Sequence, residues 1–263
     1  MLSGVRLYLR YIGVSVRSQM QYPASFVMLT LGAFLITGIE FIGIWALLHR
    51  FGNLKGWALS EIALLYGMVQ VAFSLSDATS RGFDTFAGMI KAGDFDRLLL
   101  RPRNAAHQLA GQELTLRRAG RFSQGLVILL WAASALHIAW SAATIGLVVA
   151  SILGGACLFF GLIVLQATLA FWTTESLEIV NTVTYGGVET AQYPLTIYRP
   201  WFRKFFTGVI PLACVNYFPA LAILGRPAPW GLPWVSPLVG VGFLAMALQI
   251  WKVGVRRYCS TGS

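Results

Sequence analysis

The chain has 263 residues, of which 57% are hydrophobic and 11% are charged, whereas roughly 25% of residues are charged in an ordinary soluble domain. This composition excludes a water-soluble globular protein and predicts a single all-α, polytopic membrane domain over 1–263. The net charge of +10 does not predict nucleic-acid binding, because the basic residues flank apolar segments instead of lining one polar face.

The N-terminal residues 3–21 predict an amphipathic helix that lies on the membrane surface. Val5, Leu9, Ile12 and Val16 recur at helical spacing, and three arginines fall on other faces of the helix. The apolar run that follows is too long for a cleavable signal peptide. We therefore expect the N-terminal segment to remain in the protein.

Apolar segments long enough to cross a bilayer make up most of the remaining chain. The hydrocarbon core is about 30 Å thick, so a helix needs about 20 apolar residues to cross it. The longest stretch without Asp, Glu, Lys or Arg, 122–174, has 53 residues and suffices for two crossings. We predict six transmembrane helices, at about 24–48, 59–80, 105–138, 142–172, 176–193 and 235–255.

A polar segment rich in charged residues separates the second predicted span from the third. Within it, 91–103 predicts a short, rigid helix, with Asp94 as its cap and Pro102 as its stop. Asp96 in the first turn and Arg101 in the last turn would both favour the helix dipole. This helix is expected in water, next to the membrane surface.

The distribution of Lys and Arg predicts the orientation, because these residues are more frequent on the cytoplasmic side. With both termini and the polar segment inside, 14 of the 20 Lys and Arg residues are cytoplasmic. The fifth span stays open. If 205–225 crossed the membrane in place of 176–193, the number inside would be 17, but two prolines interrupt that segment.

Five acidic residues lie within or beside the apolar segments, where an isolated charge costs about 2.5 kcal/mol or more. Each of them needs a partner or water, either as part of a polar pathway or in a structural ion pair or at the membrane interface. They are Glu40, Asp77, Glu175, Glu178 and Glu189. Glu189, beside two glycines, is the first candidate for a polar pathway.

The sequence has no recognisable motif for ATP binding or catalysis. The phosphate loop Gly-x-x-x-x-Gly-Lys-[Ser/Thr] is absent, and so are His-Glu-x-x-His and Gly-x-Ser-x-Gly. The three cysteines do not have the spacing of metal ligands. We therefore expect a non-catalytic membrane subunit, with neither a metal site nor a cofactor of its own.

Two sequence phrases resemble the permease subunits of type-2 ABC exporters, in particular a bacterial subfamily of paired permeases of similar length. The first phrase is GDFDRLLLRP at 93–102, and the second is YPLTIYRPW at 193–201. The second continues through Ile210 and Pro211 to VNYFPA at 215–220. The resemblance extends over nearly the whole chain.

The resemblance implies that the region 91–103 contains a coupling helix, which docks into a groove on an ATPase. The residues expected to carry this coupling are Gly93, Asp94, Phe95, Asp96, Arg97, Leu98, Arg101 and Pro102. It also implies a re-entrant helical hairpin over 194–225, on the outer side before the last span. The candidates for this hairpin or for a polar pathway are Glu189, Tyr193, Pro194, Trp201, Pro211, Asn216 and Pro219.

The function implied by the resemblance is that of a permease subunit of an ABC exporter in the plasma membrane of a bacterium, with both termini cytoplasmic. Two separate ATPase subunits would bind ATP and Mg²⁺, and a second permease, a paralogue or another copy, would complete the pathway. The aromatic content of 13% and the apolar spans favour a hydrophobic or amphipathic substrate. Membrane lipid is a further expected partner. The residues also leave open an ATP-independent channel, a secondary transporter and a membrane scaffold.

A separate hypothesis concerns three basic residues on the outer side of the membrane. Anionic lipid headgroups or an acidic substrate could contact Arg199, Arg203 and Lys204.

Overall fold

The computed structural model describes residues 13–101, 104–112, 115, 118–173, 177–228 and 231–258. Within these residues all regular secondary structure is helical, apart from one isolated bridge between Leu54 and Trp57. This confirms the predicted all-α fold of a polytopic membrane protein. Helices suit a bilayer because each one satisfies its backbone hydrogen bonds internally, as hydrocarbon requires.

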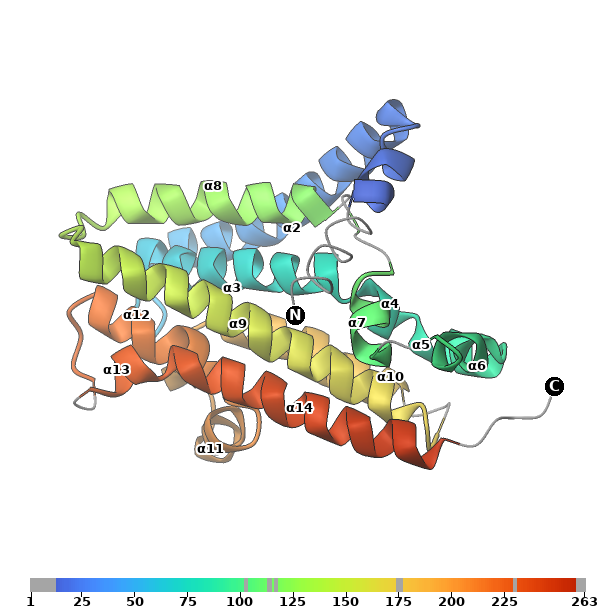
Figure 1. Ribbon diagram of the computed structural model, residues 1–263. Helices are drawn as coiled ribbons and strands as arrows, with labels where there is room; N and C mark the ends of the chain where they lie inside the picture. The colour runs from blue at the N-terminus through green and yellow to red at the C-terminus, as the bar shows by residue number, and fades with distance from the viewer. Residues whose placement is uncertain are drawn as a thin grey trace.

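Four helices in the described ranges are long and apolar enough to cross a bilayer: α2 (Pro23–Phe51), α3 (Leu59–Thr79), α9 (Ala142–Leu169) and α14 (Pro237–Arg257). Two shorter helices, α8 (Ala119–Ala135) and α10 (Leu177–Ala191), also lie where spans were predicted. Figure 1 shows α3, α8, α9 and α14 running along one another as a bundle. The most extensive packing joins α9 to α14, followed by α3 to α8 and to α9.

The crossing of α9 and α14 depends on two glycines. A Cβ atom built on Gly154 would overlap the carbonyl of Pro237, and one built on Gly240 would overlap the carbonyl of Gly154 itself. The two helix backbones therefore lie in direct contact. Small residues permit such close approach in membranes, where packing has to replace the missing hydrophobic driving force.

The predicted span over 105–138 differs from the structure, which divides this region into two helices. A short helix, α7 (Ala105–Ala110), ends at a turn in which the Gly111 amide donates to His107 O at 3.2 Å. The Thr115 amide then donates to Ala78 O, at the end of α3. This long-range bond separates α7 from α8, so α8 begins only at Ala119.

The N-terminal surface helix predicted over 3–21 lies partly outside the described residues. Of its described residues, 13–19 are helical and 20–21 form a turn, and several of the helical side chains are exposed. Two of the five acidic candidates cannot be placed either. Glu175 and the side chain of Glu178 lie outside the described part of the chain.

The region predicted as a re-entrant hairpin, 194–225, consists of short helical pieces. They are η2 (Leu195–Ile197), α11 (Pro200–Gly208), the π-helical turn η3 (Ala213–Tyr217) and α12 (Phe218–Ile223). Between α11 and the η3–α12 segment the chain bends by 83°. Pro211 and Pro219 lie at the breaks, where a missing amide hydrogen interrupts regular helical bonding. A short helix, α13 (Leu232–Val235), then leads into α14.

We predict that Gly240→Ala lowers the stability of the bundle, because the new methyl group would force the backbones of α9 and α14 apart. Overpacking of this kind costs about 1–3 kcal/mol. The measurement is thermal unfolding of the purified protein in detergent.

The matched control is Gly242→Ala on the same helix, where an added Cβ meets no atom within 4 Å. This variant should unfold within about 0.5 kcal/mol of the original protein. Equal stability of the two variants would contradict the proposed backbone contact.

Candidate functional site

Four short helices form a cluster at one end of the bundle. They are α4 (Arg81–Asp84), α5 (Phe86–Lys91), α6 (Asp94–Leu99) and α7. Figure 1 shows this α4–α7 cluster at the opposite end of the bundle from α12 and α13. It contains the described part of the predicted coupling segment, whereas Pro102 lies outside the described residues.

The helix predicted around Asp94 is present, but it begins and ends differently from the prediction. Its N-cap is Gly93, which has a φ of 73°, and the Asp94 side chain makes no capping bond. Glycine tolerates this left-handed conformation, so the chain can turn sharply between α5 and α6. The helix ends at Leu99. Arg101 was expected in the last turn and lies beyond it.

The buried side of α6 carries Phe95, whose side chain is completely buried. Its ring centroid lies 5.0 Å from that of Phe86 and 5.0 Å from that of Tyr258, and both contacts are edge-to-face. Phe171, just after α9, lies 5.7 Å away. Edge-to-face pairs add stabilisation beyond the burial of apolar area. Phe95 therefore joins α6 to α5 and to the ends of α9 and α14.

Trp251 of α14 lies at the centre of the same aromatic cluster and is 2% exposed. Its ring lies 4.8 Å from that of Phe86 and 5.1 Å from that of Phe83. Burial, together with the nearby Asp96 carboxylate, raises the pKa of the Tyr258 phenol, which borders the same rings. The short helices are thus packed on the bundle instead of extending freely into water.

Two polar and backbone contacts add to the packing of the α4–α7 cluster. Gln108 Nε2 of α7 donates to Leu98 O at the end of α6, at 3.3 Å. A Cβ atom on Gly82 would overlap the carbonyl of Leu109, so α4 and α7 lie in backbone contact. These contacts join α7 to α6 and to α4.

The outer side of α6 is exposed and combines charge with apolar surface. Asp94 and Arg97 form an ion pair at 3.4 Å, with side chains that are 53% and 84% exposed. Such an exposed pair contributes little to stability. Leu99 and Leu100 follow, and Leu100 is 85% exposed. This side of the helix is therefore free to contact another molecule.

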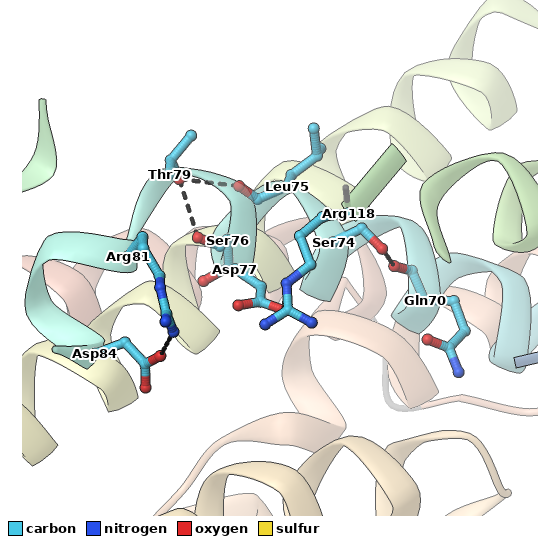
Figure 2. Close-up of polar contacts among 9 residues, drawn as sticks. All are labelled: Gln70, Ser74, Leu75, Ser76, Asp77, Thr79, Arg81, Asp84 and Arg118. Carbon is cyan, nitrogen blue, oxygen red and sulfur yellow. Dashed lines mark hydrogen bonds and ion pairs between the residues drawn. The ribbon is translucent and has the colours of Figure 1, made fainter. Parts of the chain in front are cut away.

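An ion pair with a buried carboxylate lies beside the cluster and joins two helices of the bundle. Figure 2 shows Arg118, just before α8, reaching Asp77 near the end of α3, and the Arg118 Nε–Asp77 Oδ2 distance is 2.8 Å. Their side chains are 27% and 5% exposed, and Arg81 pairs with Asp84 nearby within α4. Asp77 thus has the partner that an acidic group at this position requires. The pair holds the start of α8 against α3.

The candidates in and near the hairpin do not all gather in one place. Asn216 Nδ2 donates to Ala191 O at 2.7 Å and to Leu65 O at 3.4 Å, which joins η3 to α10 and α3. Pro194, Pro211 and Pro219 are buried and Tyr193 is half-buried, whereas Glu189 and Trp201 are exposed. The structure therefore gives Asn216 a structural contact and leaves Glu189 and Trp201 on the surface of this chain.

Two polar joints were not identified from the sequence. The Tyr66 hydroxyl donates to Thr37 O at 2.9 Å and so connects α3 with α2. At the end of the bundle away from the α4–α7 cluster, Arg226 Nε donates to Glu61 Oε1 at 2.9 Å, and its guanidinium lies 4.1 Å from the centre of the Trp57 ring. Tyr66 and Glu61 are polar residues within the apolar helix α3, but no local pattern in the sequence indicated their partners.

No group of three or more His, Cys, Asp or Glu side chains that could hold a metal ion occurs in the described ranges. The family model described as "ABC-2 family transporter protein" matches residues 34–262 of the chain. No curated protein and no solved structure gives a match.

We predict that Phe95→Ala destabilises the protein by about 3–5 kcal/mol, because it removes a ring from a completely buried site. Leu100→Ala, one residue beyond the same helix, should change the stability by less than about 0.5 kcal/mol, since its side chain already lies in water. Detergent-solubilised variants can be compared by thermal unfolding. A mild effect at Phe95 would mean that α6 is not held by the aromatic cluster.

We also predict energetic coupling between Asp77 and Arg118. Each alanine variant leaves the other charge without its partner and should cost about 3 kcal/mol. The double variant should cost clearly less than the sum of the two, with a coupling energy of about 0.5–3 kcal/mol. A cycle at the exposed pair Asp94–Arg97 is the control and should give no measurable coupling. Additive effects at Asp77 and Arg118 would show that the two side chains do not stabilise the contact between α3 and α8.

Proposed function

Since the chain belongs to the ABC-2 family of transporter proteins, which are membrane components of transporters that work with ATPase subunits, we propose that it is the permease subunit of an ATP-driven exporter. The family match confirms the resemblance to type-2 ABC permeases. The observation that carries the proposal is the structure of α6, which is anchored on one side by Phe95 and exposed on the other at Arg97 and Leu100.

In this proposal the exposed side of α6 docks on a separate ATPase. Two ATPase subunits bind ATP and Mg²⁺, and their closure displaces α6. Because Phe95 contacts residues at the ends of α9 and α14, a displacement of α6 moves those helix ends as well. Packed elements respond by discrete rigid-body shifts, since close-packed interiors do not deform continuously. The pathway would change in this way from inward-open to outward-open.

The proposed orientation places the α4–α7 cluster and both termini in the cytoplasm, and the protein in the plasma membrane. Support comes from Arg256 and Arg257 in the last turn of α14, the helix whose end packs on the cluster. Basic residues at this end agree with the positive-inside rule.

On the opposite side, we propose that 194–225 forms a re-entrant hairpin. The 83° bend supports this proposal, and so does the contact of Lys55 Nζ with the carbonyls of Thr196 and Ile197, at 3.4 Å each. Irregular backbone at membrane depth is tolerated where protein covers it. The buried segment 211–216 meets that condition.

We further propose that a second permease, a paralogue or another copy of this chain, completes the pathway. The support is the large apolar surface of α2, where Leu35, Ile36 and Ile39 are each more than half exposed. Lipid and the second permease would share this surface. A hydrophobic or amphipathic substrate fits a pathway between such helices. A channel, a secondary transporter or a scaffold works without an ATPase, so it would not need an exposed helix on which an ATPase docks.

We predict that the double variant Arg97→Glu/Leu100→Asp retains much less ATPase subunit on co-purification. Loss of a central interface contact costs about 2 kcal/mol, which corresponds to a roughly 30-fold weaker affinity. The measurement is the amount of ATPase recovered with the tagged permease, together with ATP hydrolysis by the complex.

The control is Arg50→Glu, which reverses an exposed charge at the end of α2, away from α6. It should leave recovery of the ATPase unchanged. The proposal fails if the wild-type chain recovers no ATPase, or if the Leu100→Cys variant is labelled only by thiol reagents outside the cell.

A further inference from the structure

A cavity of about 510 Å³ opens beside α11, at the end of the bundle away from the α4–α7 cluster. Its lining includes the apolar side chains of Leu195 and Phe218 and the basic side chains of Arg203 and Lys204. The volume lies within the range of about 300–1,000 Å³ that is usual for small-molecule sites. The cavity is therefore large enough for the headgroup region of an amphiphile.

The positive charges in this cavity have no acidic partner among the described residues. Arg203 and Lys204 are both exposed, and neither forms an ion pair with an acidic side chain in the described part of the chain. The hydroxyl oxygen of Thr196, which also lines the cavity, is buried and has no hydrogen-bond partner there. Buried polar atoms normally have a partner. Two cations and an unsatisfied hydroxyl thus share one apolar cavity.

The setting of α11 suits a membrane surface. Lys55, in the connection between α2 and α3, contacts the carbonyl of Thr196, which places the cavity at that end of the bundle. The chain bends by 83° between α11 and the η3–α12 segment. Figure 1 shows α11 viewed almost end-on while α9 and α14 run across the picture. Phe206 is buried and Trp201 is 65% exposed on the same helix. This is the arrangement of an interfacial helix, in which an exposed indole lies at headgroup level.

We infer that this cavity binds the phosphate-bearing headgroup of an anionic phospholipid. Arg203 and Lys204 contact the phosphate, which both residue types recognise through charge-assisted hydrogen bonds. The Thr196 hydroxyl donates a further bond, and the apolar wall at Leu195 and Phe218 contacts the start of the acyl chains. This site is independent of the proposed coupling to an ATPase.

The test measures lipid retention by the purified full-length chain in detergent, by native mass spectrometry with phosphatidylglycerol or phosphatidylcholine added. The chain should retain phosphatidylglycerol in preference to phosphatidylcholine. Arg203→Gln and Lys204→Gln should each lower this retention by about five-fold, the effect expected from one basic residue near an anionic headgroup. Thr196→Val, which keeps the shape of the side chain, should also lower it.

The matched control is Arg50→Gln, which removes an exposed arginine at the same end of the bundle but outside the cavity. It should retain phosphatidylglycerol like the wild type. Equal retention by the Arg203, Lys204 and Arg50 variants would overturn the inference, and so would equal retention of the two lipids. Displacement of the lipid by soluble glycerol phosphate would show a site for free phosphate esters, and would overturn the assignment to a lipid. None of these measurements involves an ATPase, so their outcome is separate from that of the coupling experiment.

Discussion

The burial of Phe95 is the interaction on which the rest of this structure depends. A helix of six residues is too short to be stable by itself in water, so α6 owes its conformation to the surface against which it packs. The rings of Phe86, Phe171 and Tyr258 provide that surface. They belong to three parts of the chain that are distant in sequence. One side chain therefore joins α6 to α5 and to the ends of α9 and α14.

The bilayer imposes a second constraint, because polar groups within the bundle need partners there. Asp77 is satisfied by Arg118, and the Tyr66 hydroxyl is satisfied by a backbone carbonyl of α2. Both contacts join different helices, so they specify which helices are neighbours. Close backbone contact at Gly154 and Gly240 does the same for α9 and α14. Packing and polar contacts together hold a bundle that hydrophobicity alone would leave loosely arranged.

Apolar run length predicted the four long helices, because hydrocarbon accepts little else in stretches of that size. A short helix within 91–103 was also predictable from its local pattern of charges, and α6 lies there. The sequence did not predict the separation of α7 from α8, since this depends on a bond from Thr115 to Ala78, far back in the chain. The predicted N-cap of α6, Asp94, was also wrong, because Gly93 occupies that position. Local capping rules favour aspartate, whereas the chain turns at Gly93, whose φ of 73° glycine tolerates. Pairs such as Glu61 and Arg226 are separated by 165 residues and had no local signal.

The indole of Trp251 gives the α4–α7 cluster an intrinsic optical probe. This ring is 2% exposed and lies among the same aromatic residues that hold Phe95. Its emission wavelength and intensity depend on the polarity and the distance of its neighbours. Any rearrangement that moves α6 relative to α14 changes those surroundings directly. The chain thus carries, without chemical labelling, a chromophore at the place where the α4–α7 cluster packs on α14.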